Sequence, residues 1–191
     1  MELNKVFAKY FVPSGETINE NRPACKKCGG QCCKNMGCHI SPNDMREITV
    51  ESIIALMDET NCVSLDWYEG HPVDTDKDGP WYFLRIKNQG ASMIDPSWGG
   101  QCCLLQSDGC PLLFQYRPMG GRALLPLGSQ EPECTMGYTK EQCVIDWQPY
   151  QDILVKVRDH YQSLDLVTTS PLSGLFELAQ SIFGDLGDPD E

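Results

Sequence analysis

Four of the eleven cysteines of this chain lie within nine residues, Cys25-Lys26-Lys27-Cys28-Gly29-Gly30-Gln31-Cys32-Cys33. The others follow at wider spacing: Cys38, Cys62, Cys102, Cys103, Cys110, Cys134 and Cys143. Free cysteine is ordinarily a sparse, buried residue, so thiols that cluster around glycines indicate either disulfides or a metal centre. The fold and the chemistry of the chain are therefore both expected to depend on this cluster.

The start of the chain and the cysteine count favour metal over disulfides. The first residues, Met1-Glu2-Leu3-Asn4-Lys5-Val6, and the charged segment after them lack the apolar core of a signal peptide. We therefore expect a cytoplasmic location, where structural disulfides are rare. An odd number of cysteines also leaves at least one thiol unpaired in any scheme made only of disulfides.

Composition narrows the classes of partner. The net charge is −12, from 27 acidic and 15 basic residues, and such a balance repels phosphate backbones and anionic lipid. No run of about 18 apolar residues occurs, so a membrane-spanning helix is not expected. We predict no nucleic-acid or membrane partner, and a protein partner instead.

Length and a hydrophobic content of 41% predict one domain with a core of its own. The expected divisions are an N-terminal arm at 1–24, a cysteine-cluster metal-binding domain at 25–183 and an acidic, frayed tail at 184–191. The predicted class is a small α+β fold with few strands, several helices and cysteine loops organised by metal.

Local patterns predict the individual elements. A capping signal at Ser41-Pro42-Asn43-Asp44, followed by apolar residues at helical spacing, predicts a helix that continues to about Asp58. Residues rich in β-branched and aromatic side chains predict two paired strands. The expected strands are 62–68, 81–87 and a short one at 102–105. Two further amphipathic helices are expected at 150–164 and at 172–183. Pro149 would lie near the start of the first of these helices or at a kink in it.

The first cluster has the spacing of a metal ligand set. A C-x-x-C turn brings two sulfurs together, and Gly29-Gly30 after Cys28 permits positive φ and a close approach of the backbone to an ion or cluster. Cys32 adds a third thiolate, and the group of Cys103 and Cys110 is the expected source of the fourth. Zinc and iron–sulfur clusters both accept four thiolates, so both remain open.

The adjacent pairs Cys32-Cys33 and Cys102-Cys103 suggest more than one centre. Neighbouring side chains of an extended chain point to opposite sides, so each pair is expected to serve two separate centres. The further candidate ligands are Cys38, Cys102, Cys134 and Cys143, and the alternative for each is a buried small residue. For Cys62, inside an apolar strand, we expect the buried residue.

The run Cys25-x-x-Cys28-Gly29-Gly30-x-Cys32-Cys33 resembles the signature of the CxxCxxCC (YkgJ-type) cysteine-cluster proteins, which are described as zinc- or iron-chelating. The second block of that family is similar to Cys103-Leu104-Leu105, Cys110-Pro111-Leu112 and Tyr116-Arg117-Pro118. His39 to Asp44 also resembles the segment that follows the first cluster. The resemblance covers roughly residues 25 to 125 and implies metal or cluster binding, without implying a substrate.

One position departs from the family pattern. Where the family usually has a cysteine before the arginine that follows Arg-Pro, this chain has Gly121 before Arg122. Cys38, Cys102, Cys134 or Cys143 would then replace the ligand. Arg117 and Arg122 are candidate cofactor-binding residues, because guanidinium groups offset the charge of a thiolate-rich centre or grip a carboxylate or phosphate. Their alternative is an ion pair that braces a loop.

Three functions follow from these patterns. The first is a metal-binding protein that carries one or two iron–sulfur clusters, of the 4Fe-4S type, for electron transfer or for maturation of a partner enzyme. The second is a zinc-stabilised interaction module without a redox role. The third is a cluster-dependent enzyme of the transferase type, which we do not favour because no acid–base, nucleotide or cosubstrate motif accompanies the cysteines. The surplus of thiols favours iron–sulfur over zinc.

Overall fold

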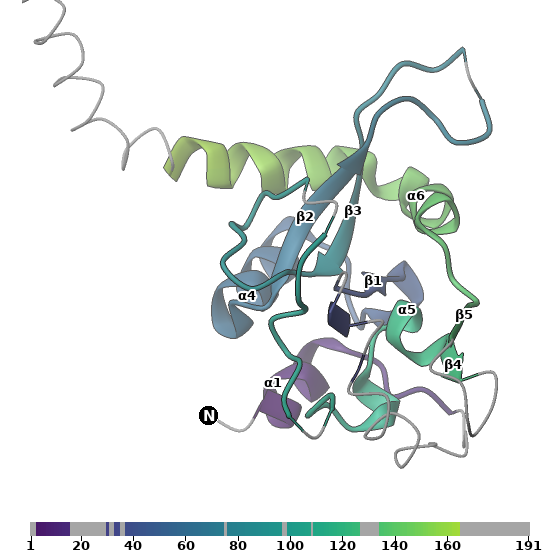
Figure 1. Cartoon of the computed structure of the whole chain (residues 1–191). Coiled ribbons are helices and arrows are strands. Elements are labelled where there is room, and N and C mark those ends of the chain that lie inside the picture. Colours follow the sequence, from purple (N-terminus) through teal and green to yellow (C-terminus); the bar gives the residue numbers. More distant parts are fainter. Residues whose placement is uncertain are drawn as a thin grey trace, which may run out of the picture.

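The structure, a computed structural model, describes residues 3–15, 30, 33–34, 37–74, 76–96, 99–107, 109–126 and 134–164, of which 125, 126 and 134–136 are described by backbone alone. Helices surround a three-stranded antiparallel sheet (Figure 1), which is the α+β class predicted from the sequence. The elements are α1 (Leu3–Tyr10), β1 (His39–Ile40), η1 (Pro42–Asp44), α4 (Val50–Thr60), β2 (Val63–Tyr68), β3 (Trp81–Ile86), η2 (Phe114–Tyr116), α5 (Met119–Arg122), β4 (Leu124–Pro126), β5 (Cys134–Met136), α6 (Lys140–Trp147) and η3 (Gln148–Tyr150).

The strands β2 and β3 form the hairpin that the sequence predicted. They pair antiparallel from Val63↔Ile86 to Tyr68↔Trp81, and the two-residue β1 pairs with the other edge of β3. The order is therefore β1-β3-β2, with β3 in the centre. A separate short ladder joins β4 to β5.

One face of the sheet is apolar and forms the core. Leu65 pairs with Leu84, and because side chains alternate along a strand, Val63 and Ile86 share their face. Helix α4 and a helix at residues 151–164 contribute to the same core, and helix 151–164 confirms the amphipathic helix predicted there. Pro149 lies in η3, between α6 and that helix.

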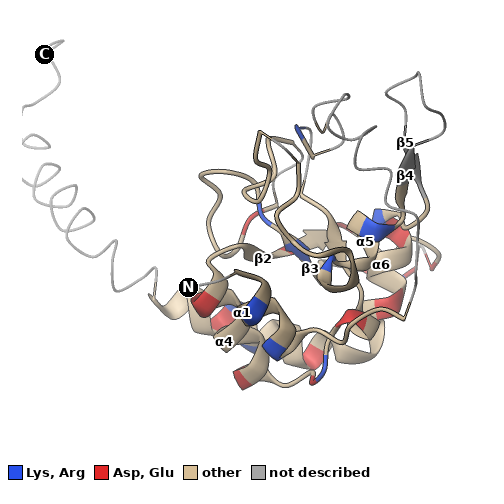
Figure 2. Cartoon of the chain, turned by 90° about the horizontal axis from the view of Figure 1, so that it is seen from below, with Lys and Arg blue, Asp and Glu red and all other residues tan. Residues whose placement is uncertain are grey.

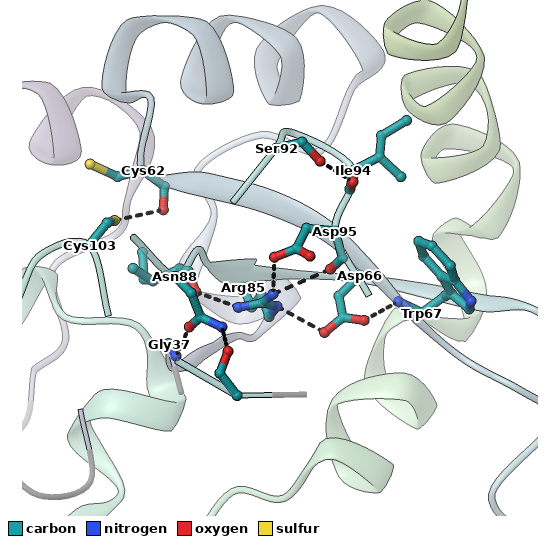
Figure 3. A network of polar contacts seen from close by, with 12 residues as sticks. Gly37, Cys62, Asp66, Trp67, Arg85, Asn88, Ser92, Ile94, Asp95 and Cys103 are labelled. Atoms are coloured by element: carbon teal, nitrogen blue, oxygen red, sulfur yellow. Dashed lines mark hydrogen bonds and ion pairs between the residues drawn. The ribbon is translucent and has the colours of Figure 1, made fainter. Parts of the chain in front are cut away.

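The opposite face carries charge although it is buried. Arg85 is 2% exposed, and its Nε lies 2.9 Å from an oxygen of Asp66, which is 3% exposed. Its Nη2 lies 2.7 Å from Asp95, on the segment that runs beside β2 (Figure 3). Lys140 of α6 contacts Asp66 at 3.8 Å, so cations offset the carboxylate that the sheet buries.

The helix predicted from Ser41 to about Asp58 is two elements. Ser41 makes a capping box with Asp44, yet the chain completes only the turn η1. Met45 then pairs with Phe11, and Arg46 donates a backbone hydrogen bond to the carbonyl of Tyr10. Pairing with the N-terminal segment therefore ends the first turn, and α4 starts afresh at Val50.

The new start of α4 has a cap of its own. The Thr49 hydroxyl accepts from the amide of Ser52, and the Ser52 hydroxyl accepts from the amide of Thr49. The helix ends at Asn61, whose φ of 48° is the left-handed conformation that asparagine tolerates at a helix end. The capping box at Thr49 follows a pattern similar to that at Ser41, so the two candidate starts differ in tertiary contacts more than in local sequence.

The strand predicted at 102–105 is also wrong. Cys102 makes an isolated bridge with Asn88, and the chain then turns, with the amide of Leu105 bonded to the carbonyl of Cys102. The predicted helix at 172–183 and the predicted tail at 184–191 lie outside the described residues.

The N-terminal segment belongs to the core. Phe7 and Phe11 are at most 1% exposed, and their rings meet edge to face at 5.1 Å. Basic positions of α1 lie near acidic positions of α4 (Figure 2), and Lys9 forms an ion pair with Glu59 at 2.5 Å. None of the described helices has the length and hydrophobicity that a membrane crossing requires.

Candidate metal centre

The C-terminal end of β3 holds three cysteines that are far apart in the sequence. The amide of Ile86 donates to the carbonyl of Cys38 at 2.8 Å, and the amide of Lys87 donates to that of Cys62 at 2.9 Å. The amide of Cys103 donates to the carbonyl of Lys87 at 3.0 Å. Main-chain hydrogen bonds therefore bring positions 38, 62 and 103 to one place.

Asn88, two residues after β3 ends at Ile86, extends the same arrangement. It bridges to Cys102, and its side-chain oxygen accepts a hydrogen bond from the amide of Gly37 at 3.0 Å (Figure 3). The amide of Cys102 donates to the carbonyl of Cys33 at 2.6 Å. The described part of the first cysteine block thus contacts the second block directly.

Two glycines allow this close approach. A Cβ added at Gly37 would lie 1.7 Å from the carbonyl oxygen of Ile86, a position that no side chain can take. Gly30 has a φ of +69°, and a Cβ added there would lie 2.7 Å from the side chain of Leu105. The glycine expected to bring the backbone close to a metal is therefore, in this structure, packed against the second block.

The thiols of Cys62, Cys102 and Cys103 influence one another. The Cys103 Sγ lies 3.7 Å from the carbonyl oxygen of Cys62. Interaction with Cys103 lowers the pKa of Cys102 to about 7 and lowers the pKa of Cys62, and the same two neighbours raise the pKa of Cys103. Cys102 and Cys103 were expected to serve separate centres, but these pKa shifts couple the two thiols.

Cys38 and Cys110 lie near Cys102 and near each other. Burial raises the pKa of Cys38 well above its ordinary value, and the nearby Cys102 and Cys110 raise it further. Burial also raises the pKa of Cys110, while Arg117 beside it acts in the opposite direction. One of the two predicted cofactor-binding arginines therefore lies next to a candidate ligand.

Gly121 meets the sulfur of Cys38. A Cβ added at position 121 would lie 3.2 Å from the Cys38 Sγ. The Cys38 thiol thus occupies the space beside the position at which the resembled family has a cysteine. Of the four residues considered as replacements, Cys38 is the one that this contact favours.

The other arginine, Arg122, forms a buried ion pair. Its Nη2 lies 3.0 Å from the Asp44 Oδ1, and it also donates to the carbonyl of Arg117 at 3.1 Å. The second oxygen of Asp44 accepts from the amides of Ser41 and Met119, each at 2.8 Å. This ion pair joins η1 to α5 and so braces the loop that places Gly121 next to Cys38.

Cys143 does not join this group. It lies in α6, fully buried, with its Sγ 3.5 Å from the carbonyl of Ile40, and burial raises its pKa. The backbone of Cys134 lies in β5, and its side chain is outside the description. Cys143 therefore matches the alternative of a buried small residue.

The remaining predicted ligands, Cys25, Cys28 and Cys32, lie outside the described residues. None of the seven cysteines with described side chains is in a disulfide: Cys33, Cys38, Cys62, Cys102, Cys103, Cys110 and Cys143. Within the described part of the chain, no three Cys, His, Asp or Glu side chains form a group that could hold a metal ion. A complete ligand set would therefore have to include side chains outside the described part.

Sequence reasoning missed the position of Cys62. The residue precedes β2, and it was expected to be buried in an apolar strand, but its thiol contacts Cys103 across the end of β3. The register of the β2–β3 hairpin was the signal that could have found it, because Val63 pairs with Ile86 and Cys62 therefore lies beside Lys87.

Comparison with family models, with curated proteins and with solved structures finds no match to this chain. The resemblance of the two cysteine blocks to the CxxCxxCC family therefore stays a prediction.

Proposed function

We propose that this protein binds metal on clustered thiolates at the end of β3, as one or two iron–sulfur clusters that serve electron transfer or the maturation of a partner enzyme. The proposed ligands are Cys25, Cys28, Cys32, Cys33, Cys103 and Cys110, with Cys38 in place of the family cysteine absent at Gly121. The observation that carries the proposal is the convergence of positions 38, 102 and 103 on residues 86–88, with the carbonyl of Cys33 bonded to the amide of Cys102.

The donor chemistry fits such a centre. The cysteines with described side chains are not disulfide-bonded. Soft thiolates select zinc or iron–sulfur clusters over hard cations such as magnesium or calcium. Arg117 would offset part of the negative charge of the centre beside Cys110. When bound, a cluster would supply one-electron chemistry; the residues of this chain would hold it, shield it and present it to a partner.

Structural zinc is the alternative, and its sites are closed and fully coordinated by protein. Cys102, next to the proposed ligand Cys103, is only 6% exposed, whereas Cys103 and Cys110 are themselves partly exposed. An electron-transfer centre, by contrast, needs an edge that a partner can approach.

The test is metal analysis of protein purified without oxygen. Iron and acid-labile sulfide in equal amounts, with the broad visible absorption of thiolate-bound iron, are expected. Colourless protein with stoichiometric zinc would replace the iron–sulfur proposal by the zinc module. Protein that holds neither metal, even after reconstitution with iron and sulfide or with zinc, would overturn metal binding altogether.

Matched variants assign the ligands. Cys28→Ser is expected to lose bound metal, and to lose stability with it, because binding at such sites contributes to folding. Cys143→Ala is the control, since its thiol lies in α6 against β1 and is expected to leave the metal content unchanged. Full metal retention in Cys28→Ser would remove the first block from the site.

A further inference from the structure

We propose that Cys62 and Cys103 form a reversible dithiol–disulfide pair, which reacts with low-molecular-weight disulfides such as oxidised glutathione. Formation of the bond would withdraw Cys103 from the metal centre, a consequence that rests on the proposed function. The bond itself does not depend on that function.

The main chain places the two residues beside each other. The carbonyl of Cys62 accepts from the amide of Lys87, and the carbonyl of Lys87 accepts from the amide of Cys103. The Cys103 Sγ lies 3.7 Å from the carbonyl oxygen of Cys62 (Figure 3). Three segments far apart in sequence are thus held together by main-chain hydrogen bonds at Cys62 and Cys103.

Exposure of the thiols favours a bond between Cys62 and Cys103 over one between Cys102 and Cys103. Cys62 and Cys103 are both partly exposed, so a small disulfide can reach them, whereas Cys102 is buried. Adjacent residues are also poor partners, because their Cα atoms are about 3.8 Å apart and disulfides usually need about 4.4–6.8 Å. Cys62 and Cys103 are not adjacent in sequence, and both are partly exposed.

The reaction balances as thiol–disulfide exchange. One thiol loses its proton to solvent and attacks a sulfur of the small disulfide, which breaks and releases one thiol. The second cysteine then attacks the mixed disulfide, forms the Cys62–Cys103 bond and releases the second thiol. The two cysteines are oxidised by two electrons, and one small disulfide is reduced to two thiols.

The bond is tested by peptide mapping. Reduced full-length protein is treated anaerobically with oxidised glutathione, alkylated and digested with trypsin. Cys62 is then the only cysteine of residues 47–77, and Cys103 lies in residues 88–122. The expected product is the two peptides linked, two hydrogens lighter than their sum, with fragmentation that assigns the bond to Cys103.

Two outcomes of the mapping would overturn the inference. The first is that Cys62 stays alkylated or ends as a mixed disulfide with glutathione. The second is that Cys62 is linked to Cys102 or Cys110. Cys102→Ser is the matched control and is expected to keep the Cys62–Cys103 link, and because the mapping is read in the wild type it does not depend on any variant folding.

The consequence for metal is measured separately. Oxidised glutathione is expected to release metal from the wild type, while Cys62→Ser keeps its metal under the same treatment. If the reduced wild type binds no metal, the proposed function is wrong, but the result of the peptide mapping is unaffected. If the reduced wild type binds metal but Cys62 can still be alkylated after treatment with oxidised glutathione, this inference is wrong and the proposed function stands.

Discussion

At the scale of single residues, the glycine before Cys38 sets the approach of the first block to the sheet. In Gly37→Ala the new methyl group would meet the carbonyl of Ile86, so the backbone must shift. We expect the free energy of unfolding to fall by about 2 kcal/mol or more, the range of overpacked sites. Urea denaturation measures it, with Gly15→Ala, which meets nothing within 4 Å, as a control that changes little. Equal midpoints for the two variants would contradict the contact.

The buried pair of Asp44 and Arg122 gives a second prediction. Arg122→Met leaves a carboxylate that is 1% exposed without its cation, so we expect a loss of about 3–5 kcal/mol of unfolding free energy. Lys77→Met breaks an exposed pair with Asp74 and should lose about 1 kcal/mol or less. Adding Asp44→Asn to Arg122→Met should recover part of the loss. Similar losses in the Arg122 and Lys77 variants would show that the buried pair contributes no more than a surface pair.

The contact between Cys38 and Gly121 predicts that a ligand can be moved. Cys38→Ser should lose bound metal, and Cys38→Ser with Gly121→Cys should regain it, because the new side chain would start 3.2 Å from the sulfur it replaces. Cys38→Ser with Gly15→Cys adds a thiol elsewhere and should regain none. Metal per protein is the measurement, and an unchanged content in Cys38→Ser would remove this residue from the ligand set.

At the scale of elements, Tyr161 ties helix 151–164 to α4. Its hydroxyl donates to Asp58 at 2.7 Å, and burial, together with that carboxylate, raises the pKa of Tyr161. A raised pKa in the folded state stabilises the fold below the ordinary value of about 10, and the contribution is lost as the pH rises above it. Tyr161→Phe should therefore be about 1 kcal/mol less stable at pH 7.

The pH dependence distinguishes this interpretation from lost packing. Above pH 10 the difference in unfolding free energy between wild type and Tyr161→Phe should narrow, because only the wild type has the phenol to titrate. Unfolding in urea at a series of pH values measures this difference. A difference that stays constant across the series would show that the hydrogen bond to Asp58 does not set the stability.

Elements were predictable where the decisive contacts are local. The hairpin of β2 and β3 follows from alternating β-branched and aromatic residues, and the helix at 151–164 follows from its spacing. The interval from Ser41 to Thr49 was not predictable, because a satisfactory capping box at Ser41 is overridden by the pairing of Met45 with Phe11, about 34 positions away in the chain.

At the scale of the whole molecule, the sequence identified the cysteines but not their partners. Spacing indicated that the two blocks belong together. The hydrogen bond from the amide of Cys102 to the carbonyl of Cys33 agrees with that expectation. The spacing gave no reason to place Cys62 in the cysteine group at the end of β3, because its position depends on the register of the hairpin. It also gave no reason to exclude Cys143 from that group, because the burial of Cys143 depends on how α6 packs. Such relations arise between elements, so they cannot be seen in the local pattern of either.

The cysteines at the end of β3 are held by amides and carbonyls, which every residue except proline possesses. Replacing one of these thiols removes a potential ligand without removing the bonds that position its backbone. The loop geometry and the identity of the ligand are therefore separable in this molecule. Over evolutionary time a thiolate can be exchanged between neighbouring positions while the frame that presents it persists.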